Sequence, residues 1–215
     1  MRRWLPVFLL AGTVAFSLVV YSRLPERVPV HWGLSGEPDR YGGRLEGAFL
    51  VPAIMALVFA LMRWLPSVDP RRANIAKFRD SYDLMVLVVM AFFAVIHVLV
   101  LGVSLGWAVD ITTVVLAGVG VLFVILGNML PRARSNFMFG IRTPWTLSSD
   151  SVWTRTHRVG GYAMVAGGLV TIAAAFVGPP LGITIAFASL MVAGLATIVY
   201  SYILWARERG GPDQR

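Results

Sequence analysis

The chain has 215 residues, of which 57% are hydrophobic and only 14% are charged, and it contains no cysteine. Soluble domains carry about a quarter charged residues, so this composition argues against a soluble protein, and the lack of cysteine excludes disulfides, thiolate nucleophiles and cysteine metal sites. The formal net charge of +8 has to be judged by where the basic residues lie before it is attributed to nucleic acid.

The apolar residues are grouped into blocks separated by charged stretches. A membrane-spanning helix needs about 20 apolar residues, and six blocks approach that length: 4–21, 48–65, 84–105, 111–130, 159–177 and 181–205. The sequence therefore predicts an all-α, multi-pass membrane protein with six transmembrane helices. We expect the first block to remain uncleaved, because no small-x-small cleavage site follows it. Pro52 is expected near the start of the second helix, where a missing N–H costs little.

The basic residues are distributed unevenly between the two sides of such a membrane protein. With six helices, both termini and the second and fourth loops share one side. That side holds all but four of the 19 basic residues; the four on the other side are Arg23, Arg27, Arg40 and Arg44. The positive-inside rule then predicts cytoplasmic N- and C-termini in a cell membrane. The positive charge reports orientation and attraction to anionic lipids, so we expect no direct contact with nucleic acid.

The first external loop, residues 22–47, is rich in proline and glycine. We expect an extended piece, a tight turn at residues 35–38 and a return. His31 and Asp39 are candidates for a hydrogen-bonded pair or a weak metal site. Zinc usually takes three or four ligands, so the structural alternative is favoured and no metal is expected. The candidate residues of this loop are Pro29, His31, Trp32, Gly36, Pro38 and Asp39.

The second loop, on the predicted cytoplasmic side, contains Asp69 followed by Pro70. This pair is typical of a helix N-cap and first helical position, so a helix is predicted to begin there and to run unbroken into the third spanning block. Ile75, Phe78 and Tyr82 would share one face of it. The two interpretations are a collar on the membrane surface and a surface that binds a partner.

The loop between the fourth and fifth helices, residues 127–158, combines glycine, proline, tryptophan and arginine at close intervals. We expect Asn128 to satisfy helix-terminal carbonyls, an extended chain around Pro144 and a helix capped by Asp150. Trp153, His157 and Gly161 would share one face of that helix. The candidate residues of the loop are Asn128, Pro131, Arg132, Asn136, Gly140, Arg142, Thr143, Pro144, Trp145, Thr146, Trp153, His157 and Arg158. Arg142, Arg155 and Arg158 near a helix N-terminus would attract anions.

Three of these patterns together resemble a known family. The run from Pro25 through His31-Trp32 to Pro38-Asp39, with residues 69–75, resembles the uncharacterised membrane domain that often precedes an SdpI domain. The run from Gly127-Asn128 through Gly140-Ile141-Arg142-Thr143-Pro144-Trp145 to His157-Arg158 resembles the SdpI signature. The implied organisation is an N-terminal membrane domain at 1–110, an SdpI-like membrane domain at 111–208 and a tail at 209–215.

The resemblance implies a bacterial membrane immunity and signal-transduction protein. Members of that family protect a cell from a secreted, membrane-active toxin peptide and hold a small cytoplasmic transcriptional repressor at the membrane. No cofactor is implied.

Two other functions stay open from the residues alone. His97 is the only ionisable residue deep in a spanning block. We expect a neutral histidine that is hydrogen-bonded to a neighbouring helix, but intramembrane ionisable groups are often functional, so a small-solute or ion transporter is the alternative. An enzyme would have to use His157 with Asp150, or His31 with Asp39. No HExxH, GxSxG or carboxylate cluster is present, so we expect no enzyme. Small residues such as Gly167 and Gly168 in the last two helices predict close helix packing.

Overall fold

A computed structural model describes residues 4–209 of the chain. It confirms the prediction of an all-α membrane protein, because six of its helices are long and apolar enough to cross a membrane. The long helices are α1 (Leu5–Val20), α2 (Arg44–Val68), α4 (Arg79–Ser104), α5 (Ile111–Met129), α7 (Asp150–Ala175) and α8 (Leu181–Arg209). Arg2, Arg3 and residues 210–215, to which the charge and tail predictions also refer, lie outside the described residues.

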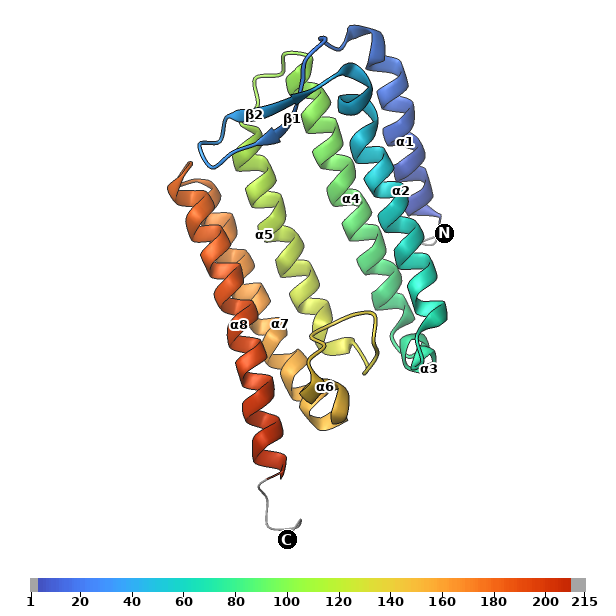
Figure 1. Ribbon diagram of the computed structural model, residues 1–215, viewed down its shortest axis with the longest axis vertical. Coiled ribbons are helices and arrows are strands. Elements are labelled where there is room, and N and C mark those ends of the chain that lie inside the picture. The colour runs from blue at the N-terminus through green and yellow to red at the C-terminus, as the bar shows by residue number, and fades with distance from the viewer. Residues whose placement is uncertain (1–3, 210–215) are drawn as a thin grey trace.

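Short elements gather at the two ends of the helix bundle (Figure 1). At one end, which we call the hairpin end, lie the 3-10 helix η1 (Tyr21–Arg23) and the antiparallel strands β1 (Val28–Trp32) and β2 (Pro38–Gly42). At the other, the motif end, lie α3 (Arg72–Ala76), the 3-10 helix η2 (Leu130–Arg132) and α6 (Pro144–Ser148). The hairpin confirms the extended piece, turn and return expected of the first loop.

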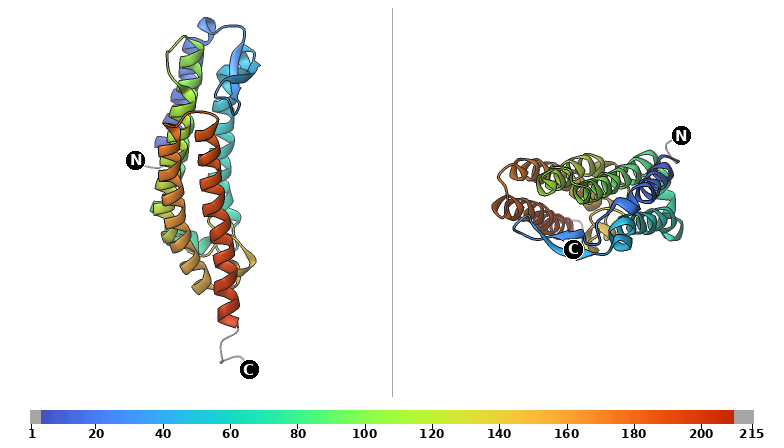
Figure 2. Two further views of the ribbon diagram at one scale, coloured as in Figure 1. Left: turned by 90° about the vertical axis from the view of Figure 1, so that its left-hand side faces the viewer. Right: turned by 90° about the horizontal axis from the view of Figure 1, so that it is seen from above.

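The helices pack as two groups of three. Helices α1, α2 and α4 contact one another, α7 packs along both α5 and α8, and α4 contacts α5 between the groups. Figure 2 shows the bundle from the side and from above, with the hairpin lying across its end. The two groups are therefore joined through α4 and α5, and also by the segments at the hairpin end and the motif end described below.

Helix α2 contains two prolines, and a hydroxyl group from another helix compensates for each. A proline removes the hydrogen bond to the carbonyl four residues earlier. For Pro52 that carbonyl belongs to Ala48, and it accepts a hydrogen bond from Ser17 Oγ of α1 at 2.6 Å. The prediction that Pro52 lies near the helix start was wrong, because α2 begins at Arg44. The polar Arg44 and Glu46 extend the helix beyond its apolar block.

The second proline, Pro66, leaves the carbonyl of Met62 without its helical donor. Tyr82 of α4 supplies the replacement, because its hydroxyl donates to Met62 O at 2.6 Å. Both prolines therefore mark places where α2 is hydrogen-bonded to a neighbouring helix instead of to itself. Such substitution of a lost backbone bond is how membrane helices tolerate proline.

Helices α5 and α7 touch through two pairs of glycines. A Cβ on Gly120 would lie 2.6 Å from the carbonyl oxygen of Gly168, and one on Gly127 would lie 2.8 Å from that of Gly161. Only hydrogen atoms fit at such a distance, so the backbones of the two helices are in direct contact. The predicted packing of the last two helices through small residues is found at Gly167, which meets Ser189 and Ala193 of α8, whereas Gly168 faces α5.

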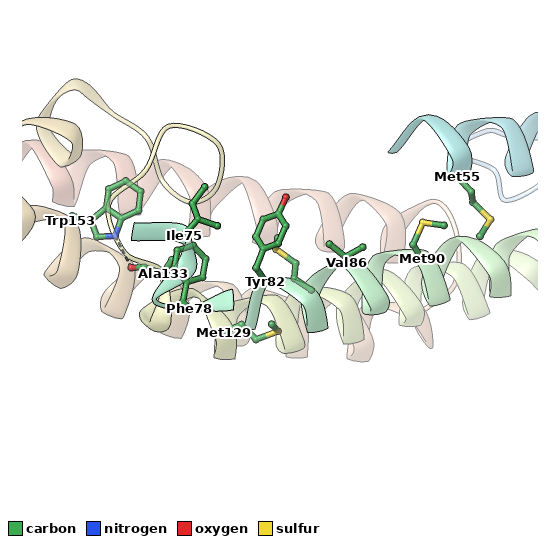
Figure 3. Packing of buried hydrophobic residues seen from close by; sticks show 10 residues of the cluster. Met55, Ile75, Phe78, Tyr82, Val86, Met90, Met129, Ala133 and Trp153 are labelled. Atoms are coloured by element: carbon green, nitrogen blue, oxygen red, sulfur yellow. Dashed lines mark hydrogen bonds between the residues drawn. The ribbon is translucent and has the colours of Figure 1, made fainter. Parts of the chain in front are cut away.

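A buried apolar cluster runs from the middle of α4 to the motif end (Figure 3). Met90, Val86 and Tyr82 follow one face of α4, and Phe78 and Trp153 complete the cluster toward the 133–149 segment. Phe78 lies against both Tyr82 and Phe139 of that segment, at ring-centroid distances of 6.5 and 6.4 Å. The core thus extends past the ends of the spanning helices and packs against the loop that follows α5.

The predicted unbroken helix from Asp69 into the third spanning block was wrong. Helix α3 ends at Ala76 and α4 begins at Arg79, with a break at Lys77 and Phe78. Asp69 does cap the turn that leads into α3, because its Oδ1 accepts the N–H of Arg71 at 2.6 Å, but its Oδ2 accepts the N–H of the distant Phe137 at 2.8 Å. Tertiary contacts to the 133–149 segment therefore override the local helical pattern.

Two predictions for the 127–158 loop also need correction. The chain around Pro144 is helical, because Thr143 and Thr146 form a capping box and Pro144 occupies the first turn of α6, where a fixed φ suits a helix. Ser149 caps α7 by accepting the N–H of Val152, and Asp150 lies within the first turn.

Candidate functional site

The first part of the candidate site is a network at the motif end that joins the α2–α3 loop to the 133–149 segment. Asp69 is 2% exposed, and its two oxygens accept the N–H groups of Arg71 at 2.6 Å and Phe137 at 2.8 Å. A buried carboxylate needs such donors to offset its lost hydration. Asp69 therefore holds two segments from opposite halves of the chain at a fixed spacing.

Arg71 and Asn74 make the reciprocal contacts. The Arg71 guanidinium donates to Ser135 Oγ and, at 2.9 Å, to the carbonyl of Leu147, and it lies over the ring of Phe137 at 5.1 Å. Asn74 donates to the carbonyl of Ser135 at 2.9 Å. Five donors in a planar fork allow Arg71 to reach several acceptors at once.

Asn136 shapes the segment from within. It is fully buried, its amide oxygen accepts the N–H groups of Met138 and Phe139 at 2.8 and 2.6 Å, and its amide nitrogen donates to the carbonyl of Arg134 at 2.7 Å. Asparagine commonly bonds the backbone two residues onward in this way. The result is a compact turn whose backbone polar groups are satisfied by its own side chain.

Trp153 and His157 connect this turn to α7, as their predicted common face indicated. Their rings stack at a centroid distance of 3.9 Å, and Trp153 Nε1 donates to the carbonyl of Ala133 at 2.8 Å (Figure 3). The N–H of Ile141 donates to His157 Nε2 at 3.0 Å, so Nδ1 carries the ring proton and donates to Trp153 O at 2.8 Å. Both ring nitrogens are thus used by the backbone.

Gly140 has to be a glycine because of this histidine. Its φ is +110°, and a Cβ there would lie 2.3 Å from His157 Nε2. The fully buried His157 is therefore a structural link between α7 and residues 140–141. The arrangement gives it no free nitrogen for proton transfer, and no hydrogen bond joins it to the exposed Asp150.

Helix α6 attaches the 133–149 segment to α8. Thr143 Oγ1 lies 3.2 Å from Ser201 Oγ, and the indole of Trp145 packs edge-on against Tyr202 at 5.1 Å. Of the predicted residues, the structure brings together Asn136, Gly140, Thr143, Pro144, Trp145, Thr146, Trp153 and His157 in this motif module, which we define as residues 133–149 with the facing side chains of α7 and α8. Arg142 joins it by donating to the carbonyl of Phe137.

Several predicted residues lie outside the module. Asn128 is exposed within α5 and forms no hydrogen bond to the described residues through its side chain, so the expected carbonyl-capping role was wrong. Arg132 and Arg158 are exposed, and Pro131 packs against Gly161. Lys77, Arg132 and Arg134 instead border an open hollow of about 730 Å³ beside the module. The motif end therefore presents a basic surface around a rigid, buried centre.

Sequence reasoning did not include Asp69, Arg71, Asn74 and Ser135 among the site residues. The first three lie in the 69–75 run, which was recognised as a pattern and interpreted as a helix start. One sequence feature could have indicated their contact: the two polar patterns, 69–75 and 127–158, fall on the same predicted side of the membrane.

The second part of the candidate site is the hairpin. His31 Nδ1 lies 2.5 Å from Asp39 Oδ1, which confirms the predicted pair. Within residues 4–209 no group of three or more potential ligands is placed to hold a metal ion. Pro29 pairs with Tyr41 and Trp32 with Pro38 across the strands. The hairpin is thus held by its own cross-strand contacts.

The hairpin turn reaches the C-terminal half of the chain. Gly36 has a φ of +81°, its carbonyl accepts the hydroxyl of Thr112 at 3.0 Å, and a Cβ on it would lie 2.6 Å from Pro179. The turn therefore rests on the start of α5 and on the α7–α8 loop. A movement of the hairpin would therefore displace its contacts with α5 and with the α7–α8 loop.

Beneath the hairpin lies an apolar cavity of about 350 Å³. Its walls come from β1, α2, α4, α5 and α8, and they include Trp32, Val51, Val100, Val115 and Ile183. His31 and Thr112 supply polar groups at this cavity. A mostly apolar hollow with few polar groups is the usual form of a small-ligand site.

His97, the candidate intramembrane residue, is hydrogen-bonded within the bundle. Its Nε2 lies 2.9 Å from Ser17 Oγ, whose own proton is donated to Ala48 O. Nε2–H is therefore the donor, and the neutral ring links α4 through α1 to α2. Its Nδ1 has no hydrogen-bond partner among the described residues. This arrangement is what a structural histidine would show, as expected for a neutral ring bonded to a neighbouring helix.

Comparison with known proteins agrees with this geometry. Residues 132–201, which contain most of the motif module, match the SdpI/YfhL protein family, and residues 8–56 match a domain of unknown function, DUF1648. The chain is 25% identical to the immunity protein SdpI of Bacillus subtilis (strain 168) over 194 residues, which cover 90% of this chain and 91% of that protein. The chain is thus similar to the SdpI/YfhL protein family over residues 132–201 and to an SdpI immunity protein along most of its length.

A second relative matches a shorter stretch. An uncharacterized protein of Archaeoglobus fulgidus is 45% identical over 47 residues, which are 22% of this chain and 25% of that protein. No solved structure matches the chain significantly. The SdpI relative is named an immunity protein, and the six long apolar helices of this chain are those of a membrane protein.

Proposed function

We propose that this chain protects its cell from a secreted, membrane-active peptide and signals the encounter to a cytoplasmic protein. The observation that carries the proposal is the similarity to an immunity protein along 90% of the chain. It is supported by the presence of one candidate site at each end of the bundle. The hairpin would face outward and the motif end, with both termini, the cytoplasm, in accord with the excess of basic residues at the motif end.

The cavity beneath the hairpin is the proposed peptide site. A membrane-active peptide arrives with apolar side chains already at the depth of the outer leaflet, and a hollow of about 350 Å³ holds one or two such side chains. Val51, Val100 and Val115 offer apolar contact, and His31 and Thr112 supply polar groups for the peptide backbone. Binding there removes the peptide from the bilayer that it would otherwise disrupt.

The proposed signal passes along α5 and α7. The hairpin turn contacts Thr112 at the start of α5, and the glycine contacts of α5 with α7 are too close for the helices to move independently. Helix α7 carries Trp153 and His157, which hold the motif module. A ligand that prefers one arrangement of these helices would shift the module with them.

The partner at the motif end is proposed to be a small repressor with an acidic face. The open hollow there is lined by one acidic residue, Asp80, and four basic residues, Lys77, Arg79, Arg132 and Arg134. Complementary charge both steers association and fixes orientation. Binding to this surface would hold the repressor away from its DNA while peptide is present.

The proposal is tested by survival of a sensitive bacterium that expresses the chain during challenge with a panel of secreted membrane-active peptides. Protection against at least one peptide is expected. Val115→Trp, which fills the cavity, should abolish that protection, and Val114→Trp should keep it. Val114 is the neighbouring α5 residue, 38% exposed, and it does not line the cavity. Membrane abundance of both variants is measured in parallel.

Absence of protection against every peptide at normal abundance would refute the immunity function. Full protection by Val115→Trp would refute the cavity as the peptide site while leaving immunity intact. The two failures are therefore distinguishable.

A further inference from the structure

An arginine-lined cleft at the motif end adjoins the open hollow described above, with which it shares Ala76 and Arg79. It has a volume of about 410 Å³ and lies between the end of α2, helix α3 and the start of α4. Each of the three elements contributes one arginine: Arg63 from α2, Arg72 from α3 and Arg79 from α4. Pro66, Ile75 and Tyr82 provide apolar wall.

The cleft is held open by the same irregularities that the sequence did not predict. Pro66 removes a backbone bond from the last turns of α2, and the hydroxyl of Tyr82 fixes the freed carbonyl of Met62 at 2.6 Å. The break between α3 and α4 turns the short α3 away from the α4 axis, and Ile75 is 2% exposed against the core. The walls are therefore anchored to the core, and the cleft does not depend on a flexible loop.

The charge in the cleft is not balanced. Arg63 and Arg79 share one oxygen of Asp83, at 3.3 and 3.2 Å. Arg72 is exposed and forms no ion pair within residues 4–209. Three guanidinium groups thus face one carboxylate. Guanidinium is suited to phosphate because its planar fork donates two parallel hydrogen bonds.

The depth of the cleft in the bilayer follows from its neighbours. Leu61, Trp64 and Val68 on the last turns of α2 are 41%, 58% and 49% exposed. Exposed apolar side chains on a spanning helix face lipid, and tryptophan prefers the level of the headgroups. The arginines lie within a turn or two of these residues, so they are placed at headgroup depth on the leaflet of the motif end.

We propose that this cleft binds the phosphate of an anionic phospholipid headgroup. The arginines take the phosphate oxygens, and the half-buried Met62 and Pro66 contact the adjoining glycerol and upper acyl chain. Basic pockets between membrane helices bind anionic lipids by this combination of charge and apolar surface. The bound lipid would join α2, α3 and α4 and so stabilise the α2–α3 loop that carries Asp69 and Arg71. The assignment does not depend on the immunity function.

The proposal is tested with the purified full-length chain in a neutral detergent. Thermal unfolding and retained lipid, the latter by native mass spectrometry, are measured with phosphatidylglycerol, phosphatidylcholine or inorganic phosphate added. Phosphatidylglycerol should raise the melting temperature and remain bound, and the other two should do neither. Arg72→Gln should weaken the apparent affinity for phosphatidylglycerol by about five-fold or more.

Arg63→Gln provides a second variant, and Arg155→Gln is the matched control. Arg155 is an exposed arginine at the motif end of α7 that does not line the cleft, so its variant should bind like the wild type. Equal loss in the Arg72 and Arg155 variants would show a general charge effect and overturn the proposal. If inorganic phosphate binds as well as phosphatidylglycerol, the cleft is a site for free anions, and the lipid assignment is overturned.

Discussion

The hydrogen-bonded link from His97 through Ser17 to the carbonyl of Ala48 gives the sharpest test of how the N-terminal helices are held together. Ser17 and His97 are fully buried. Replacing Ser17 with alanine removes the hydroxyl that donates to Ala48 O at 2.6 Å and accepts from His97 Nε2 at 2.9 Å. Two buried polar groups are then left without a partner.

The expected cost follows from those two groups. A buried donor or acceptor left unsatisfied costs about 1–3 kcal/mol, and hydrogen bonds between membrane helices measure toward the lower end, about 0.6–1.7 kcal/mol. Ser17→Ala should therefore lower the free energy of unfolding by about 2 kcal/mol. In a Pro52→Ala background the restored N–H of residue 52 satisfies Ala48 O. The same Ser17→Ala change should then cost about 1 kcal/mol less, because only His97 remains unsatisfied.

The assay is unfolding in detergent followed by tryptophan fluorescence for the wild type, the two single variants and the double variant. Thr13→Val is the control. Thr13 lies one turn earlier on α1; its hydroxyl donates to Leu10 O of its own helix and has a longer contact to Met55 Sδ at 3.8 Å, and neither partner is the carbonyl that Pro52 frees, so its cost should be the same with and without Pro52. An equal cost of Ser17→Ala in both backgrounds would refute the claim that Ser17 replaces the proline's missing donor.

Three further predictions concern other parts of the fold. Gly127→Ala places a Cβ 2.8 Å from the carbonyl oxygen of Gly161 and should destabilise the chain by about 1–3 kcal/mol, whereas Gly12→Ala, which meets open space, should be neutral in the same unfolding assay. Trp153→Phe removes the hydrogen bond to the carbonyl of Ala133. It should lower the free energy of unfolding by about 1–3 kcal/mol and speed backbone hydrogen exchange in residues 133–141. Unchanged exchange rates in that segment would contradict this prediction. Asp110 caps α5, and the hydroxyl and N–H of Thr113 lower the pKa of its carboxyl. Asp110→Ala should therefore cost about 1 kcal/mol above about pH 4 and progressively less below it, as the wild-type carboxyl is protonated; a difference independent of pH would contradict this.

The spanning helices could be predicted from the sequence because their signal is local. A block of apolar residues long enough for the bilayer has no alternative that satisfies its backbone, so α1, α5 and α8 lie where the blocks predict them. Turn chemistry also served well: Pro29, Gly36 and Pro38 predict the hairpin, and His31 with Asp39 predicts its cross-strand pair. The four-residue spacing of Trp153 and His157 predicted their common face, whereas the stacking of their rings is seen only in the structure.

The motif end was harder because its contacts are between distant segments. Asp69 followed by Pro70 has every local mark of a helix start, yet its carboxylate is used by Phe137, 68 residues onward. At the break between α3 and α4, Phe78 packs on Phe139 of the distant 133–149 segment. Gly140 could not be explained from the local sequence either. A glycine in a loop suggests a turn, but a side chain is excluded at this position by His157 Nε2, which lies on another element.

The orientation of the chain in the membrane is the central claim, because it decides which candidate site meets a secreted peptide and which meets a cytoplasmic protein. The chain has no cysteine, so Ser35→Cys in the hairpin turn and Ser151→Cys at the exposed start of α7 each introduce a single reactive thiol. With a membrane-impermeant maleimide on intact cells, the account predicts labelling of Cys at 35 and protection of Cys at 151 until the cells are lysed. Labelling of 151 from outside, with 35 protected, would contradict it.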